Sequence, residues 1–120
     1  MSDIKKIIEF YKIVEKLGQV KRDVKLSDGS YESDSSHILK VAYLALAAAP
    51  YLQTKVDTTK MLELALVHDL AEAECGDIPL CAQRTNTALQ EQKKQKELAA
   101  IERCRDILPQ AAGEKIYNLF

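Results

Sequence analysis

Residues 67–77 read Val-His-Asp-Leu-Ala-Glu-Ala-Glu-Cys-Gly-Asp, so an imidazole and several carboxylates stand in an otherwise apolar run. Acidic side chains are rarely buried unless they are paired or bind a metal. On a helix, His68 and Glu72 would share one face, and Asp69 and Glu72 would also be neighbours. Asp77 follows a glycine, where the chain can turn back toward that face. The spacing therefore predicts a polar cluster in this region.

Imidazole and carboxylate ligands together suit manganese, iron, cobalt or zinc, and carboxylates also suit magnesium. The chain has two histidines, His37 and His68, and both lie in apolar surroundings. A competing interpretation makes each histidine a hydrogen-bonded core residue and turns the acids toward solvent. Helix spacing leaves both interpretations open, because His68 and Asp69 project about 100° apart on an ideal helix.

Outward from this stretch, the sequence predicts an all-α bundle of about five helices, without a sheet. The first helix begins at Ser2 and Asp3, ends at Gly18, and carries an apolar stripe at Ile4, Ile7, Ile8, Tyr11, Val14 and Leu17. Residues 20–32 contain a turn cluster and are predicted to form a loop. The other predicted helices span about residues 37–49, 57–76, 85–108 and 110–120.

Two of these helices have a distinctive composition. The helix at about residues 37–49 is rich in alanine and apolar on nearly all sides, which predicts deep burial. The long helix is polar, and its charge-rich part at residues 91–97 is predicted to be a solvated face, with Leu89, Leu98, Ile101 and Ile107 pointing inward. Cys75 is predicted to pack in the core rather than to act as a nucleophile.

Composition predicts one cytoplasmic domain over residues 1–120. Hydrophobic residues make up 47% and the formal net charge is −1, so nothing favours nucleic acid as a partner. The N-terminal segment lacks the apolar run of a signal peptide, and the longest apolar run, residues 41–50, is too short to span a membrane. Three cysteines without a C-x-x-C pair argue against a disulfide scaffold.

Four elements in order carry a family resemblance: Val20-Lys21-Arg22, Asp28-Gly29-Ser30, a glutamate five residues before a histidine at residues 32–37, and the His-Asp stretch at residues 66–78. Together they resemble the HD-domain metal-dependent phosphohydrolases, and most closely the 5′-deoxynucleotidase branch. The resemblance covers essentially the whole chain. It implies an HD-domain helical bundle that acts on a small nucleotide.

The resemblance also implies residue roles. The divalent metal ligands would be His37, His68 and Asp69. Arg22 would contact the substrate phosphate, for which a planar guanidinium is well suited. Glu72 would be the acid/base group beside the attacking water, with Asp77 as a second catalytic group. The substrate would also be bound by Asp77, Ile78, Pro79 and Leu80.

Two departures from the family pattern stand out. Some relatives have a tryptophan after the arginine that helps to select the sugar, and here that position is Asp23. Relatives also take a further aspartate ligand from a late helix, whereas the last aspartate here is Asp106. We therefore expect a chain without the usual C-terminal helices of the family. Apolar surface left uncovered in this way would favour a homodimer or a higher oligomer.

The leading functional prediction is metal-dependent hydrolysis of a nucleoside 5′-monophosphate to nucleoside and phosphate. One alternative is an HD phosphohydrolase that acts on another nucleotide. A second is a degenerate HD domain that binds a nucleotide or a protein partner without turnover. A third is a helical bundle with a purely structural role.

Overall fold

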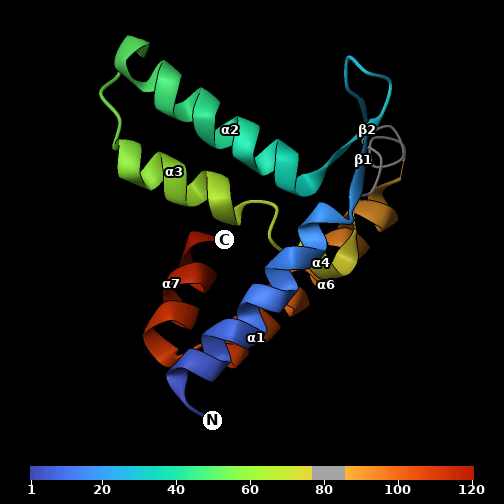
Figure 1. Ribbon diagram of the computed structural model, residues 1–120, viewed down its shortest axis with the longest axis vertical. Coiled ribbons are helices and arrows are strands. Elements are labelled where there is room, and N and C mark those ends of the chain that lie inside the picture. Colours follow the sequence, from blue (N-terminus) through green and yellow to red (C-terminus); the bar gives the residue numbers. More distant parts are fainter. Residues whose placement is uncertain (77–85) are drawn as a thin grey trace.

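The computed structural model describes residues 1–76 and 86–120, which form helices and one small antiparallel sheet (Figure 1). The predicted all-α fold class is confirmed. The elements are α1 (Asp3–Glu15), β1 (Lys21–Lys25), β2 (Tyr31–Ser33), α2 (Asp34–Ala48), α3 (Thr58–Val67), α4 (Glu72–Cys75), α6 (Thr87–Ile107) and α7 (Gln110–Leu119), with short 3-10 helices η1 (Lys16–Gly18) and η2 (Ala49–Tyr51). In the described ranges, no helix combines the length and hydropathy needed to cross a lipid bilayer.

Side-chain caps fix the starts of the main helices. Ser2 Oγ accepts a hydrogen bond from the Lys5 amide, and Asp57 accepts one from the Lys60 amide, as the sequence predicted. Ser33 Oγ accepts the Ser36 amide, so α2 begins at Asp34, three residues before the predicted start. Each cap satisfies a backbone donor that the helix itself cannot pair.

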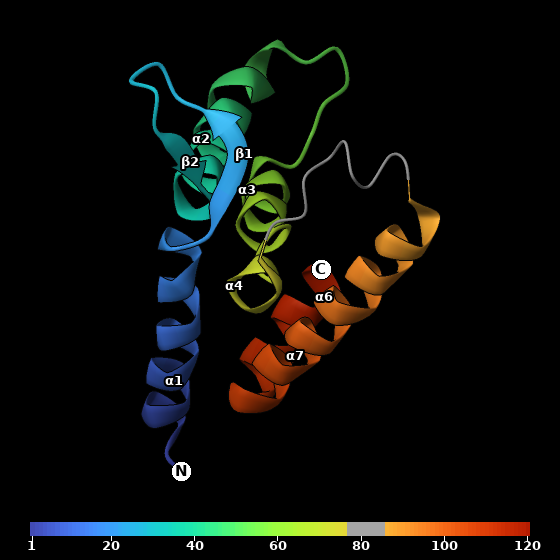
Figure 2. The same cartoon turned by 90° about the vertical axis from the view of Figure 1, so that its right-hand side faces the viewer.

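The core lies where α1, α4 and α6 meet. Its buried members are Ile13, Leu17, Ile38, Leu70, Ala71, Ala73, Ala100, Ile101 and Cys104. The predicted stripe on α1 was largely wrong, because Ile4, Ile7, Ile8 and Tyr11 are 48–71% exposed. Val14 and Leu17 of the predicted stripe do pack on the core, together with Phe10 and Ile13, so the second half of α1 and η1 meet the core. The N-terminal half projects beyond it (Figure 2).

The prediction of deep burial for α2 was also wrong. Asp34 and Ile38 are its buried residues, whereas Leu39, Tyr43, Leu44 and Leu46 are each more than half exposed. The two helices α2 and α3 pack against each other as a hairpin that extends away from α1 (Figure 1). Among the described elements, α3 is the main neighbour of α2, and much of the remaining apolar surface of α2 is exposed. The long helix differs as well: Ile101 is fully buried, but Leu98 is exposed.

The loop predicted at residues 20–32 is a short hairpin. Strands β1 and β2 pair antiparallel, with Lys21 opposite Ser33 and Lys25 opposite Tyr31. Asp28 accepts hydrogen bonds from the amide and hydroxyl of Ser30 at the turn, as expected of a turn cluster. The strands escaped prediction because they are short and mostly exposed, so apolar and polar residues do not alternate along them.

The helix predicted over residues 57–76 is interrupted. Helix α3 ends at Val67, and the next turns are closed by i→i−3 hydrogen bonds such as Leu70 N to Val67 O and Glu72 N to Asp69 O, at 3.1 and 3.0 Å. Helix α4 then ends at Gly76, whose positive φ of 70° suits glycine. This tighter winding at residues 68–71 replaces the uniform helical face that the sequence implied.

Helices α6 and α7 lie close together at Gly113, and this contact gives a stability prediction. A Cβ at this position would lie 2.3 Å from the backbone oxygen of Arg105, which cannot move independently of α6. We expect Gly113→Ala to lower the free energy of unfolding by about 1–3 kcal/mol, as overpacking does. Urea denaturation followed by circular dichroism measures this.

Gly18→Ala is the matched control, because a Cβ there would meet Ser35 Oγ at an ordinary 3.6 Å. Its stability should stay within about 1 kcal/mol of that of the wild type. Equal stability of the Gly113→Ala variant and the wild type would contradict the close α6–α7 approach.

Candidate metal centre

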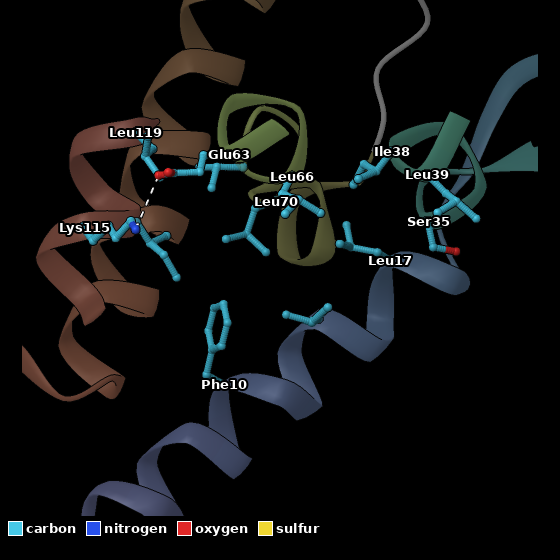
Figure 3. A pocket seen from close by; sticks show the side chains of 13 residues that line it. Phe10, Leu17, Ser35, Ile38, Leu39, Glu63, Leu66, Leu70, Lys115 and Leu119 are labelled. Atoms are coloured by element: carbon cyan, nitrogen blue, oxygen red, sulfur yellow. Dashed lines mark ion pairs between the residues drawn. The ribbon is translucent and has the colours of Figure 1, made fainter. Parts of the chain in front are cut away.

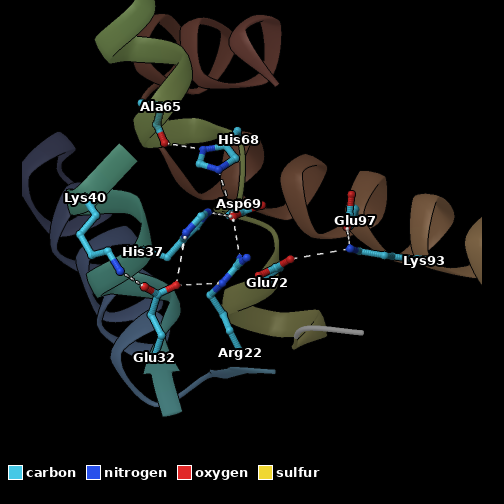
Figure 4. A network of polar contacts seen from close by, with 10 residues as sticks. All are labelled: Arg22, Glu32, His37, Lys40, Ala65, His68, Asp69, Glu72, Lys93 and Glu97. Atoms are coloured by element: carbon cyan, nitrogen blue, oxygen red, sulfur yellow. Dashed lines mark hydrogen bonds and ion pairs between the residues drawn. The ribbon is translucent and has the colours of Figure 1, made fainter. Parts of the chain in front are cut away.

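Three side chains from two separate segments converge on one point (Figure 4). Asp69 Oδ2 lies 3.4 Å from Nε2 of His37 on α2 and 3.0 Å from Nε2 of His68 at the end of α3. One ligand atom from each residue lies within 4.8 Å of the others. The structure thus brings together the three residues that the family resemblance implies as metal ligands.

In each imidazole, Nε2 lies near Asp69, and the other ring nitrogen, Nδ1, faces an oxygen atom. His68 Nδ1 is 2.6 Å from the carbonyl oxygen of Ala65, which can only accept, so Nδ1 carries the proton and donates. His37 Nδ1 faces Glu32 Oε1 at 3.4 Å. Both Nε2 atoms therefore point toward the Asp69 carboxylate. Two imidazole nitrogens and a carboxylate oxygen, with acceptors behind the rings, fit a divalent transition metal.

Glu32 forms a second layer behind His37. Its side chain is 3% exposed, its Oε1 lies 3.1 Å from Arg22 Nε, and its Oε2 pairs with Lys40. The Lys40 hydrogen bond is the main cause that lowers the pKa of Glu32, assisted by the charges of Lys40, His37 and Arg22 and opposed by burial. Arg22 Nη1 lies 3.6 Å from Asp69 Oδ2, so Arg22 spans the two carboxylates.

A second buried acid, Glu72, begins α4 and faces a lysine from the long helix. Lys93 Nζ on α6 lies 3.8 Å from Glu72 Oε1 and 3.5 Å from Glu97. The prediction that residues 91–97 form only a solvated face was therefore incomplete, because the Lys93 side chain is just 18% exposed. This arrangement keeps a cation beside the predicted acid/base group.

Sequence reasoning assigned no role to Glu32, Lys40 or Lys93. Glu32 was named only as part of a family motif. An acid next to an apolar helix can become buried, and a buried acid needs an oppositely charged partner. Lys93 could not be singled out among its charged neighbours. Four predicted substrate or catalytic residues, Asp77, Ile78, Pro79 and Leu80, lie outside the described residues.

The described cysteines do not suit nucleophilic chemistry. Burial raises the pKa of Cys75, and it raises the pKa of Cys104 to about 11. A thiol that stays protonated is a poor nucleophile. The prediction that Cys75 packs rather than reacts is consistent with its contact with the core.

An apolar cavity of 490 Å³ is a separate feature of the fold (Figure 3). It is lined mainly by aliphatic and aromatic side chains of α1, η1, α2, α3, the turn after α3, and α7, among them Phe10, Leu17, Leu66, Leu70 and Leu119. Its charged side chains, Lys115 and Glu63, pair with each other at 3.5 Å. The described lining therefore offers no cluster of metal ligands, unlike the grouping of His37, His68 and Asp69.

Comparison with known proteins matches residues 14–120 to the HD domain. The 5′-deoxynucleotidase HDDC2 of Xenopus laevis is 33% identical over 97% of this chain and 55% of its own length. A 5′-deoxynucleotidase of Photobacterium profundum is 30% identical over 88% of this chain and 56% of its own length. The chain spans little more than half the length of these relatives.

Solved structures agree. A predicted metal-dependent phosphohydrolase from Magnetospirillum magnetotacticum superposes with a TM-score of 0.83 at 25% identity, covering 98% of this chain and 57% of that one. A protein from Pyrococcus horikoshii has a TM-score of 0.69 at 29% identity, covering 93% and 60%. The overall arrangement of helices is therefore shared with these proteins.

The cluster predicts metal binding. Metal-stripped protein should bind Mn²⁺ or Co²⁺ in calorimetric titration, and His68→Ala or Asp69→Asn should weaken binding by at least the roughly 10–100-fold that loss of an outer partner costs. Glu74→Gln is the matched control, because Glu74 pairs with Arg103 instead of the cluster. Unchanged affinity in both cluster variants would refute the site.

Glu32 predicts a pH-dependent contribution to stability. Its pKa is lowered in the folded protein, so the ionised form stabilises the fold above the unfolded-state value of about 4.3, and this stabilisation is lost as pH falls through the folded-state value. The difference in unfolding free energy between wild type and Glu32→Gln should be constant near neutrality and shrink below about pH 4.3.

Urea denaturation with chelator present, repeated over that pH range, measures the difference. Glu9→Gln is the control, because Glu9 forms only an exposed ion pair with Lys12 and should matter little at any pH. A wild-type advantage over Glu32→Gln that does not change with pH would contradict the assignment.

Proposed function

Because the chain belongs to the HD domain family, we propose that it hydrolyses the phosphomonoester of a nucleoside 5′-monophosphate at the centre formed by His37, His68 and Asp69. The observation that carries this proposal is the convergence of these three ligand atoms within 4.8 Å. The relatives named 5′-deoxynucleotidase and the metal-dependent phosphohydrolase structure support it.

We propose His37 Nε2, His68 Nε2 and Asp69 Oδ2 as the atoms that hold the divalent metal. When bound, such an ion supplies Lewis acidity and lowers the pKa of coordinated water. Two imidazoles and a carboxylate suit manganese, cobalt, iron or zinc, and the carboxylate also suits magnesium.

Arg22 is proposed to bind the substrate phosphate. Its guanidinium lies half-buried between Glu32 and Asp69, with Nη1 beside the metal ligands, so a phosphate oxygen near the centre would meet a cation that is already oriented. Holding the phosphate this way converts binding energy into correct placement for attack.

Glu72 is proposed to take the proton from the attacking water. It is buried, with Lys93 Nζ 3.8 Å from its Oε1, and a carboxylate is a common general base. Asp77 as a second catalytic group, and its contacts to substrate together with Ile78, Pro79 and Leu80, remain proposals that rest on the family resemblance.

Three further proposals concern the whole chain: residues 1–120 form one HD domain, the protein is cytoplasmic, and it associates as a homodimer. The exposed apolar side chains of α2, including Leu39, Tyr43 and Leu44, support association, because contiguous apolar surface favours contact with another molecule.

The function is tested by phosphate release from a panel of ribo- and deoxyribonucleoside monophosphates with added Mn²⁺ or Co²⁺. Both sugars belong in the panel, because Asp23 stands where some relatives have a tryptophan. We expect turnover, and we expect Arg22→Ala to raise KM by about 10–100-fold, the range for losing a hydrogen bond to a charged group.

Arg103→Ala is the matched control, since Arg103 pairs with Glu74 away from the cluster, and its KM should stay within about twofold of wild type. Metal-loaded wild type that binds nucleotides without releasing phosphate would instead establish a binding-only HD domain.

A further inference from the structure

We propose that Glu32 is a positioning residue whose single buried carboxylate orients both His37 and Arg22. The inference rests on the proposed function, because it assigns His37 to the metal and Arg22 to the phosphate. The new element is that one residue, Glu32, contacts both His37 and Arg22 on the side away from Asp69. Figure 4 shows His37 and Arg22 next to one carboxylate oxygen of Glu32.

One oxygen of Glu32 serves two partners. Oε1 lies 3.1 Å from Arg22 Nε and 3.4 Å from His37 Nδ1, and the other oxygen pairs with Lys40. The side chain is only 3% exposed. A carboxylate in such a place is costly unless its partners compensate, so the site is built around this group.

The chain path explains why Glu32 can reach both partners. It lies in β2, directly before the Ser33 cap of α2, and His37 follows in the first turns of that helix. Arg22 lies in β1, next to Lys21, which is paired with Ser33 across the hairpin. The two-stranded hairpin therefore brings Arg22 to the carboxylate at the start of α2.

The contact with His37 has a chemical consequence. A neutral imidazole has one N–H, and an acceptor at Nδ1 keeps the proton there. The unprotonated Nε2 then faces Asp69 Oδ2, as in His68, where the Ala65 carbonyl plays the same part. Outer partners of this kind fix the tautomer and ring orientation of a metal-binding histidine.

The ion pair with Arg22 places the proposed phosphate-binding group beside the same carboxylate. With Nε beside Glu32 Oε1, the Nη1 end of the guanidinium extends to 3.6 Å from Asp69 Oδ2. Lys40 pairs with the second oxygen and adds a positive charge that offsets the carboxylate. The proposed metal ligand, His37, and the proposed phosphate-binding group, Arg22, therefore both contact Glu32 Oε1.

The experiment compares Glu32→Ala and Glu32→Gln with wild type in three readouts. Long-range ¹H–¹⁵N NMR spectra of the metal-free protein at alkaline pH report the tautomer of His37, which is simple because the chain has only two histidines. Calorimetry gives Mn²⁺ affinity without substrate. Steady-state kinetics gives KM and kcat at saturating metal.

We expect Glu32→Ala to lose the Nδ1–H preference of His37, to bind Mn²⁺ about 10–100-fold more weakly, and to raise KM. Glu32→Gln keeps a carbonyl acceptor, so the tautomer and most of the metal affinity should be retained, while KM still rises because the charge opposite Arg22 is gone. Glu74→Gln, which removes a different ion-paired acid, should change none of the three.

An unchanged His37 tautomer and unchanged Mn²⁺ affinity in a folded Glu32→Ala variant would overturn the proposal. If Glu32→Ala does not fold, Glu32→Gln provides the test: a KM equal to that of wild type would overturn the Arg22 part. The tautomer and affinity readouts need no turnover. A wild type that binds metal without hydrolysing nucleotides would therefore refute the proposed function and still leave the role of Glu32 tested.

Discussion

The contact on which the site depends is the meeting of Arg22, His37 and His68 at one oxygen of Asp69, all within 3.6 Å. These residues come from β1, α2 and the end of α3, so the carboxylate ties three separate parts of the chain together. Two imidazoles and a guanidinium around one carboxylate need further polar partners, because polar groups that leave water without a partner are destabilising. Glu32 and the Ala65 carbonyl are such partners.

The convergence of His37, His68 and Asp69 was the most predictable part of the molecule. An imidazole and acids in an apolar run need a physical reason, and the motif order around His37 and residues 66–78 supplied a family resemblance. The helix starts were also readable, because Ser2 and Asp57 form the caps that their side chains suit. What periodicity could not supply was the break after Val67, since no glycine or proline marks it.

Burial was predicted less well than helicity. An apolar side chain marks a surface that can be buried, but the chain must also provide a neighbour. Ile4 on α1 and Leu44 on α2 are apolar and exposed because no described element covers them. The opposite error occurred at Lys93 and Glu32, which are charged yet mostly buried because each has an oppositely charged partner on another secondary-structure element. Such partners are invisible to local patterns.

The tight winding at residues 68–71 has a consequence for how this protein can change over evolutionary time. Two successive residues, His68 and Asp69, face the polar cluster, and the next two, Leu70 and Ala71, are buried in the core. An insertion or deletion of one residue here would exchange core and cluster positions and damage both at once. Length variation is far better tolerated in the exposed hairpin turn at Asp28 and Ser30, where few packed neighbours constrain the backbone.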